Sequence, residues 1–445
     1  MTTTIFKKSL IAATIALATG QVHAAAFQLN EHSASGLGRA YAGEAAIADN
    51  ASVLARNPAA MTTFDKMAVS VSGTYIKPDV DVEGKTSGNL TTPTGTVPNY
   101  FNRDASASDI APAAFVPASY FIQPLNDQWA WGIGLFSNYG LSTEYDKNFA
   151  AGSGAGDTEL LTFNINPNIA YRVNKQFSIG AGINAVYAEA ELNRYAGVLA
   201  PVLSQPVKAG GTGVPHSADT KIASLKGDTW GFGWNVGTLY EVNENHRFAL
   251  TYRSQVDLSF DGDFKGTTSG YKTVDGNLKL DLPAQAEFAG YHRLNQQFAV
   301  HYSVNWTDWS AFEELKATSS QCKNGVCLQK DEKFKDSTRY SIGGTWYINP
   351  AWEARLGFAY DNTPIEAEYR SLSIPDSDRI WYSAGATYHI NTDMSVDFGM
   401  AYLDGKKVDV NEGLVSHDGT INNPRWQGTS HGNAFLASAQ FNMKF

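Results

Sequence analysis

Two side chains with catalytic potential, His301 and Ser303, lie two residues apart in the alternating segment 298–306. This spacing places both on one face of a strand, and a histidine base beside a serine hydroxyl is an arrangement that ester hydrolases use. The chain, however, contains no Gly-x-Ser-x-Gly elbow and no pair of histidines at metal-ligand spacing. Polar residues that share one face of a strand are also common without doing chemistry. We therefore predict no catalytic residue, no metal site and no cofactor, with a lipase as the alternative.

Both cysteines lie in one short segment, Cys322-Lys323-Asn324-Gly325-Val326-Cys327. An Asn-Gly two-residue turn would place their side chains on opposed positions of a hairpin. We predict a disulfide between Cys322 and Cys327, which requires an oxidising compartment. The alternative is a pair of free thiols.

The first 24 residues have the features of a secretory signal peptide: Lys7 and Lys8, an apolar run over 10–18, and a small-residue cleavage site at 22–24. Their removal would leave 32 basic residues (34 less 2) against 44 acidic ones, a formal charge of -12. That balance argues against nucleic acid as a partner. The mean hydropathy of -0.27 does not exclude a membrane protein, since barrel strands mix lumen and lipid residues.

The last strand of the chain alternates in polarity up to its terminal residue. Phe435, Phe441 and Phe445 fall on one face, and Ser438 and Gln440 fall on the other. In lipid only a closed sheet satisfies its backbone, so this pattern predicts a strand of an outer-membrane β-barrel. A soluble β-sandwich, which also alternates but buries its apolar face, is the bland alternative.

The same pattern recurs along the chain and predicts an all-β fold, a fourteen-stranded antiparallel transmembrane barrel over residues 67–445. The candidate strands are 67–77, 113–122, 128–141, 159–173, 176–195, 221–242, 246–261, 277–293, 297–314, 335–348, 351–369, 379–390, 393–410 and 433–445.

Short connections alternate with long ones in this strand pattern. The short turns fall at 124–127, 174–175, 243–245, 294–296, 349–350 and 391–392. In bacterial barrels short turns are periplasmic and long loops extracellular. Tryptophans beside the short turns (Trp129, Trp346, Trp352) and Trp306 and Trp309 further along are expected in the two aromatic girdles.

A barrel this wide is not filled by its own side chains. Residues 25–66 are rich in Ala, Gly and Ser and do not alternate, so we expect them to form a hatch inside the lumen. Gly36-Leu37-Gly38 does not follow a strand, and small residues for tight packing explain it better than a phosphate loop.

Eight short blocks carry a further pattern: 27–31, 35–40, 43–49 and 56–59 in the hatch, and 137–141, 230–235, 250–254 and 373–376 beyond it. Together they resemble the outer-membrane long-chain fatty acid transporters, the FadL family. The resemblance covers the whole mature chain and implies a monomeric fourteen-stranded barrel in the Gram-negative outer membrane, closed by an N-terminal hatch.

The resemblance also implies ligand-binding residues. An Arg and a Lys beside the inner pocket correspond to Arg194 and Lys330, and the Cys322–Cys327 hairpin departs from the family pattern just before Lys330. Phe27 corresponds to the residue whose movement couples binding to opening. Without the resemblance, each cation would be an ordinary surface residue near a loop.

A lateral exit is the other implication. Asn138, Tyr139 and Gly140 interrupt the third predicted strand, where a glycine can host a bulge. In the family this kink opens sideways into the outer leaflet, facing a small residue that corresponds to Gly237. The hatch segment that lines the pathway corresponds to Asn57, Pro58 and Ala59; alternatively, Pro58 only ends a helical turn.

We therefore expect passive, ligand-gated uptake of long-chain fatty acids, with the outer-membrane lipid as the receiving phase. A channel for alkanes or aromatic hydrocarbons is the closest alternative, followed by a general diffusion porin and an energy-coupled receptor.

Overall fold

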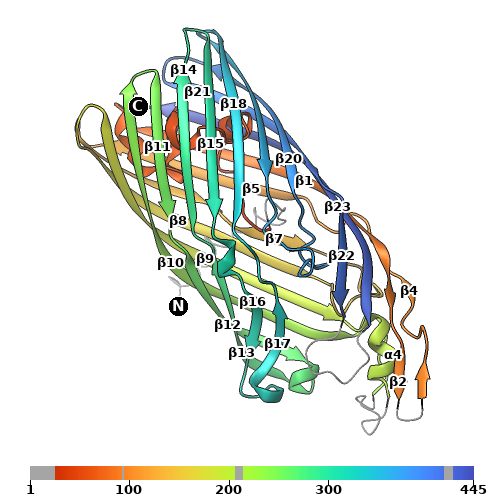
Figure 1. Ribbon diagram of the computed structural model, residues 1–445. Coiled ribbons are helices and arrows are strands. Elements are labelled where there is room, and N and C mark those ends of the chain that lie inside the picture. The colour runs from red at the N-terminus through yellow and green to blue at the C-terminus, as the bar shows by residue number, and fades with distance from the viewer. Residues whose placement is uncertain (1–25, 93–94, 206–213, 415–423) are drawn as a thin grey trace.

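The computed structural model describes residues 26–92, 95–205, 214–414 and 424–445, and the predicted signal peptide, residues 1–24, lies outside them. Within the described residues, fourteen antiparallel strands close into a barrel (Figure 1). The barrel closes because β1 (Ala68–Ser87) pairs on one side with β5 and on the other with the last strand, β23. The predicted architecture is confirmed.

Each wall strand is hydrogen-bonded to the next in chain order. After β1 they are β5 (Ala114–Pro124), β6 (Trp129–Phe136), β8 (Thr158–Arg172), β9 (Phe177–Tyr195), β10 (Lys221–Asn243), β11 (His246–Arg253), β14 (Gln285–Arg293), β15 (Phe298–Thr307), β18 (Ser337–Asn349), β19 (Trp352–Asp361), β20 (Arg379–His389), β21 (Met394–Gly405) and β23 (Arg425–Lys444). All fourteen candidate strands overlap these elements, although β1 and β23 are longer than predicted and β19 ends eight residues earlier (361 against 369).

Several wall strands are broken and continue toward the long loops as separate elements. These are β7 (Gly140–Thr143), β12 (Val256–Gly266), β13 (Thr273–Leu282), β16 (Glu314–Thr318), β17 (Val326–Asp331) and β22 (Val408–Gly413), with β4 (Arg103–Asp104) beside β1 and a small hairpin of β2 (Leu90–Thr92) and β3 (Gly95–Val97). Short helical turns also occur in the half of the barrel that carries the long loops: η3 (Gly197–Leu199), α4 (Ala200–Leu203), η5 (Thr267–Ser269), η6 (Trp309–Ala311) and η7 (Lys323–Gly325).

At each of the six short turns in the described chain, an asparagine fixes the local conformation. In every case its Oδ1 accepts the backbone N–H two residues further on, at 2.8–2.9 Å. This Asx-type bond replaces the backbone pairing that the turn lacks. The asparagines are Asn126, Asn174, Asn243, Asn295, Asn349 and Asn391.

The outer surface near the short turns is apolar and aromatic. Phe435, Phe441 and Phe445 are exposed, while Ser438 and Gln440 on the same strand are buried toward the lumen. Trp129, Trp346 and Trp352 are exposed beside the short turns, as expected for a girdle.

The segment ahead of β1 lies within the ring of strands, near the short-turn end (Figure 1). It forms α2 (Ala34–Leu37), α3 (Glu44–Ile47), η1 (Ala51–Ala55) and η2 (Pro58–Thr63), all largely buried. We call residues 26–66 the hatch. Its backbone packs directly on the wall: a Cβ at Gly38 would lie 2.8 Å from the Cα of Gly385.

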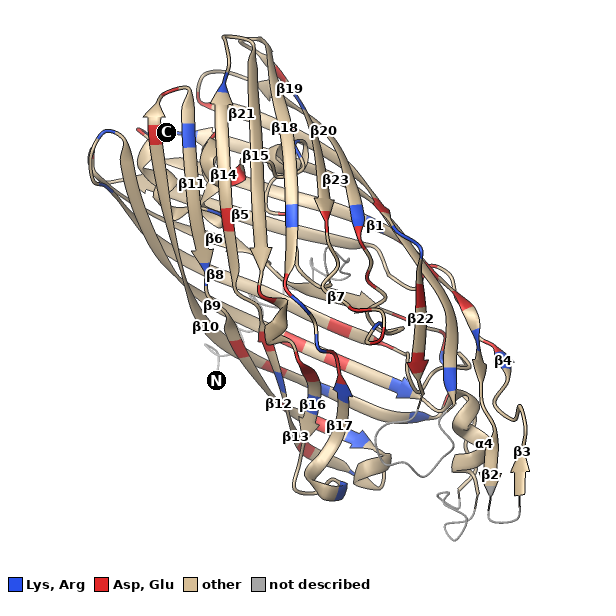
Figure 2. Ribbon diagram, in the orientation of Figure 1, with Lys and Arg blue, Asp and Glu red and all other residues tan. Residues whose placement is uncertain are grey.

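Acidic and basic residues of both signs lie on the strand parts that run toward the long loops, including β12, β13, β16, β17 and β22 (Figure 2). Among the described residues, no helix has the length and apolar character needed to cross a membrane.

Candidate functional site

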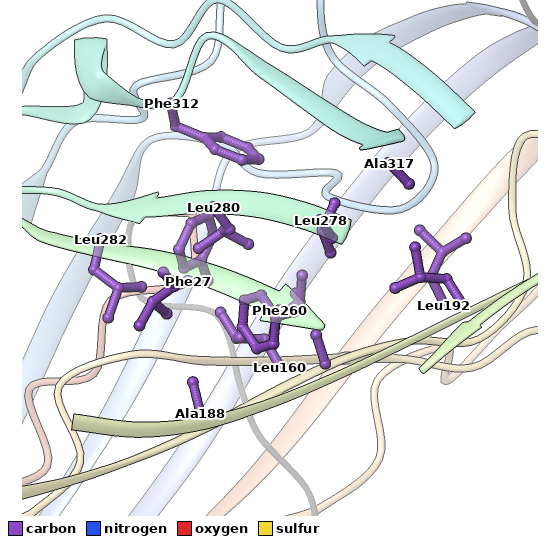
Figure 3. Close-up of a cluster of buried hydrophobic side chains, with 14 of the residues drawn as sticks. Phe27, Leu160, Ala188, Leu192, Phe260, Leu278, Leu280, Leu282, Phe312 and Ala317 are labelled. Atoms are coloured by element: carbon purple, nitrogen blue, oxygen red, sulfur yellow. The ribbon is translucent and has the colours of Figure 1, made fainter. Parts of the chain in front are cut away.

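An apolar cluster fills the lumen between the hatch and the long loops. Phe27 of the hatch lies among leucine and phenylalanine side chains of the wall (Figure 3). The buried members used below are Phe27, Tyr139, Leu160, Val186, Leu192, Val256, Leu258, Phe260, Leu278, Leu280, Leu282, Trp309 and Phe312. We call this set the apolar cluster.

Two strand breaks produce this cluster. Leu250 and Tyr252 of β11 are exposed on the outer face, whereas Val256 and Leu258 of β12 are buried in the lumen, so even-numbered residues change face between the two strands. The partner strands β14 and β13 break opposite this point, at Pro283. The prediction of one continuous two-faced strand over 246–261 is therefore wrong, because above the hydrocarbon layer the outer face carries polar residues and the apolar residues turn inward.

Phe27 packs edge-on against three aromatic rings. Its centroid lies 4.6 Å from Trp309, 5.4 Å from Phe312 and 6.1 Å from Tyr139. Trp309 is fully buried, so its predicted place in an outer girdle is wrong; the turn η6 carries it into the lumen. Edge-to-face packing of this kind fixes the first described residues of the hatch.

Phe27, Arg194 and Lys330 all line one cavity. Most of its remaining lining is apolar and includes Leu160 and Leu280. A larger, more polar cavity, lined by Ser371 and Arg425 among others, shares Arg194 and Lys330 with it. The structure thus brings the three predicted residues together, with the two cations between a polar and an apolar space.

Arg194 is buried at the end of β9, and its hydrogen bonds go only to neutral groups. Nη1 donates to the carbonyl oxygens of Asp157 (3.3 Å) and Asn193 (2.9 Å) and to Thr158 Oγ1 (3.2 Å). Nη2 donates to Ser373 Oγ at 2.8 Å. The guanidinium is therefore held in place without direct contact to a carboxylate.

Lys330 has acidic neighbours instead. Its Nζ lies 2.7 Å from Glu412 Oε1 and 3.8 Å from Glu332 Oε1. Burial raises the pKa of Glu332, in the loop between β17 and β18, to about 7. An anionic ligand at Lys330 would compete with Glu412, whereas Arg194 is already open to such a ligand.

The third wall strand has a kink. Phe136 at the end of β6 faces Asn164 of β8, and Gly140 at the start of β7 faces Leu161, so residues 137–139 take three positions where the partner has two. This one-residue bulge contains Asn138 and Tyr139 and ends at Gly140, as predicted for a bulge. The hatch fills the lost pairing through a bridge between Gln28 and Tyr139.

The wall is incomplete on the other side of the kink. The ladder between β5 and β6 ends at the pair Ser119–Leu135. Beyond it, residues 114–118 of β5 pair with β1, and β7 pairs with β8. Within the described residues, β5 and β7 therefore share no ladder.

Asn57, Pro58 and Ala59 begin the turn η2 of the hatch. Asn57 Oδ1 caps this turn by accepting the N–H of Ala59 at 3.0 Å. Asn57 Nδ2 donates to the carbonyl oxygens of Ala45 (2.9 Å) and Thr238 (3.1 Å), so one side chain joins two hatch segments to the wall. Pro58 occupies the first position of the turn, where it costs no hydrogen bond.

Gly237 lies against this part of the hatch. A Cβ at Gly237 would collide with Asn57 Oδ1 and lie 3.1 Å from Pro58 Cδ. Gly237 was expected to face the kinked residues 138–140, but the nearest atoms to a Cβ at this position belong to Asn57 and Pro58 of the hatch. Gly180 on β9 similarly makes room for Ala59.

His301 and Ser303 bond to different partners. His301 Nε2 lies 2.9 Å from Thr345 Oγ1, and its ring stacks on Tyr291. Ser303 donates to Glu287 Oε1 at 2.8 Å and accepts the backbone N–H of Gly43 in the hatch. These residues support the hatch rather than forming a base and nucleophile pair.

Cys322 and Cys327 are joined by a disulfide with a Cα–Cα distance of 5.2 Å. They are not opposed positions of a ladder as predicted, because Val326 pairs with Thr318 and Cys322 lies inside the turn. The carbonyl of Cys327 accepts Thr268 Oγ1 at 2.8 Å, which ties this hairpin to η5 three residues before Lys330.

The comparison with known families identifies this architecture. A family model described as outer membrane protein transport protein (OMPP1/FadL/TodX) matches residues 15–445. The chain belongs to this family. As a FadL-family member it is an outer-membrane transport protein and not an enzyme, so the lipase alternative is discarded.

Individual relatives support this assignment over the whole chain. A long-chain fatty acid transport protein of Escherichia coli O6:H1 is 45% identical over 466 residues, 99% of each chain. Outer membrane protein P1 of Haemophilus influenzae is 41% identical over 92% of each chain.

Solved structures share the FadL-family fold. A Pseudomonas aeruginosa FadL homologue has a TM-score of 0.81 at 22% identity, covering 95% of this chain and all of that one. The Pseudomonas putida toluene transporter TodX has a TM-score of 0.66 at 17% identity, covering 95% of this chain and all of that one. At these identities the likeness concerns the fold.

Proposed function

We propose that this protein carries long-chain fatty acids passively across the outer membrane and releases them sideways through the kinked third strand. The observation that carries the proposal is the position of Arg194, a buried guanidinium bonded only to neutral groups at the rim of an apolar cavity. The cavity would receive acyl-chain carbons, and the guanidinium would donate hydrogen bonds to the carboxylate.

The energetics favour such a ligand. Each methylene that leaves water contributes about 0.8 kcal/mol, so a sixteen-carbon acid gains on the order of 10 kcal/mol before ordering costs. Its carboxylate is costly to desolvate unless a cation meets it. Arg194 and Lys330 would supply that charge, and no external energy is needed for binding.

The kink supports the lateral route. In the closed state Tyr139 pairs with Gln28 of the hatch, and β7 has no ladder with β5. Movement of Phe27 would release this bridge and open the gap between β5 and β7. An insoluble ligand leaving there enters the outer leaflet without crossing water.

A hydrocarbon channel is the second candidate, because the family also contains the toluene transporter TodX. Toluene carries no charge, so a pocket for such ligands has no use for two cations at its rim. Arg194 and Lys330 therefore favour the carboxylate ligand.

The deciding experiment compares uptake of a long-chain fatty acid and an alkane of equal length in cells that carry Arg194→Ala. We expect fatty acid uptake to fall about tenfold or more, since a charge-assisted hydrogen bond contributes roughly 1.5–3 kcal/mol, with alkane uptake unchanged. Lys226→Ala, at a lysine that is 60% exposed and paired with Glu189 and Glu191, is the matched control. Equal loss for both ligands would overturn the electrostatic part of the mechanism, and a large steady ion current through the wild type in planar bilayers would indicate a porin.

A further inference from the structure

A second buried cation, Arg253, lies at the other end of the apolar cluster. Its Nη2 donates to the carbonyl oxygen of Ala55 in the hatch at 2.7 Å, and its Nη1 donates to Asn184 Oδ1 on β9. Its guanidinium lies 5.4 Å from the ring centroid of Phe136, the last residue before the kink. All three partners are uncharged, and no acidic residue of the described chain forms an ion pair with Arg253.

Arg253 borders two cavities. One is small and lies between Asn138 and Tyr139 of the kink and the apolar side chains Val256 and Leu282. The other is lined by polar groups that include Gln28, Arg56 and Glu287. Each arginine therefore lies between a polar and an apolar space: Arg194 at the cavity beside Phe27, and Arg253 beside the kink.

Neutral donors surround this position. Six asparagines from β8, β9, β10 and the kink bond to one another through their side-chain amides at 2.8–3.2 Å. These are Asn138, Asn164, Asn166, Asn168, Asn184 and Asn235, and we call them the asparagine cluster. Asn164 Oδ1 has no hydrogen-bond partner. The cluster also accepts Arg253 at Asn184 and donates to the carbonyl oxygen of Ile183 from Asn166. Because these amides are uncharged and not held in ion pairs, they can rotate to donate to a passing carboxylate.

The two arginines are far apart along the wall. Asn184, which contacts Arg253, and Arg194 are ten residues apart on β9, which corresponds to roughly 33 Å at the rise of a strand. A carboxylate that leaves Arg194 without a second cation would lose its partner inside the lumen, at a cost of several kcal/mol. A cation beside the kink would give the carboxylate a partner at the end of that path.

We propose that Arg253, with the asparagine cluster, is a second carboxylate-binding site that receives the head group of the ligand at the lateral exit. This inference rests on the proposed function. The competing explanation is structural: Arg253 only secures the end of η1 through the carbonyl of Ala55.

Arg247 separates the two explanations. It also donates to a hatch carbonyl, that of Ile47 at 3.1 Å, but it is ion-paired with Glu241 at 3.1 Å. Arg247→Gln therefore removes a similar contact with the hatch without removing an unpaired cation. Arg253→Gln removes the unpaired cation, and Arg253→Lys keeps the charge.

The experiment uses the full-length protein in detergent with palmitic acid labelled with ¹³C at the carboxyl carbon. At saturation we expect two bound carboxylate resonances, of which Arg253→Gln removes one and Arg194→Ala removes the other. Arg253→Lys and Arg247→Gln should retain both. In cells, Arg253→Gln should slow palmitate uptake about tenfold and leave 1-hexadecanol uptake within twofold.

Retention of both resonances in Arg253→Gln would overturn the proposal. So would an equal slowing of palmitate and 1-hexadecanol by Arg253→Gln, which would assign it a structural role in the hatch. A single bound resonance that depends on Arg194 would support the proposed function and reject the second site. No bound resonance in the wild type would reject the proposed function itself.

Discussion

Gly140 at the start of β7 donates its backbone N–H to the carbonyl oxygen of Phe27 at 2.8 Å. In the same bridge Leu29 donates its N–H to the carbonyl of Asn138 at 2.7 Å. The hatch therefore provides two backbone hydrogen bonds at the bulge, where residues 137–139 do not pair with β8. Phe27 therefore contacts the aromatic wall of the cavity with its ring and the kink with its carbonyl oxygen.

Loss of the Phe27 ring should uncouple the hatch from the kink. Phe27→Ala removes contacts with Trp309 and Phe312, and truncation of a buried phenylalanine costs about 3–5 kcal/mol. We expect a fluorescent fatty acid to dissociate at least tenfold faster in stopped-flow measurements, with the barrel still folded. Phe101→Ala, an equally buried ring in a different cluster, should leave the dissociation rate unchanged. Identical rates in wild type and Phe27→Ala would separate this residue from gating.

A methyl group at Gly237 should loosen the hatch. Gly237→Ala forces Asn57 away from the cap of η2, and loss of such a cap costs about 1 kcal/mol, with the bonds to Ala45 and Thr238 lost as well. We expect ion conductance in planar bilayers to rise severalfold. Gly344→Ala, where the nearest atom would be 3.4 Å away, is the control and should remain closed. Unchanged conductance in Gly237→Ala would show that the cap does not hold the hatch.

The wall of the barrel was predictable because its signals are local. Phe435 and Phe441 face lipid by strand parity alone, and asparagines such as Asn349 mark short turns that lack other structure. The same parity failed at Ser254, where the apolar residues keep their even numbers but turn inward. The polar residues at odd-numbered positions change face as well: Thr251 is buried toward the lumen, whereas Asp257 is exposed on the outer surface. An alternating pattern shows neither how deep a residue lies in the membrane nor where a strand break reverses which face points to the lumen.

The site depended on contacts between distant segments. The resemblance to the family supplied Phe27, Arg194 and Lys330, and the structure places them round one cavity, although their binding of a ligand stays a prediction. Trp309 was assigned to a girdle because its position in the sequence cannot reveal the turn η6 that brings it to Phe27. Arg253 was recognised only as part of a motif, since nothing local distinguishes an unpaired buried arginine from one facing water.

Affinity for an anionic ligand should fall as the pH rises through 7. Burial raises the pKa of Glu332 to about 7, so this carboxyl is largely neutral at pH 6 and charged at pH 8, where it competes for Lys330. Its unfolded counterpart ionises near 4.5, so the raised pKa also costs stability increasingly between pH 4.5 and 7.

The pH measurement uses hexadecanesulfonate, whose head group keeps its charge over this range. We expect its affinity to drop about three- to tenfold between pH 6 and 8 in the wild type. In Glu332→Gln the affinity should be independent of pH and as high as that of the wild type at pH 6. A pH dependence that survives in Glu332→Gln would place the titrating group elsewhere.

Reduction of the disulfide should act on the ligand site through Lys330 and leave the barrel intact. The bond closes a loop of about six residues, for which the chain-entropy model gives roughly 2 kcal/mol, and it lies in the long-loop half away from the hatch. With a reductant we expect faster tryptic cleavage after the exposed Lys323 and a severalfold weaker fatty acid affinity. The double variant Cys322→Ser/Cys327→Ser should match the reduced wild type and no longer respond to the reductant. If reduction leaves affinity unchanged while cleavage accelerates, β17 holds Lys330 in place without help from the hairpin.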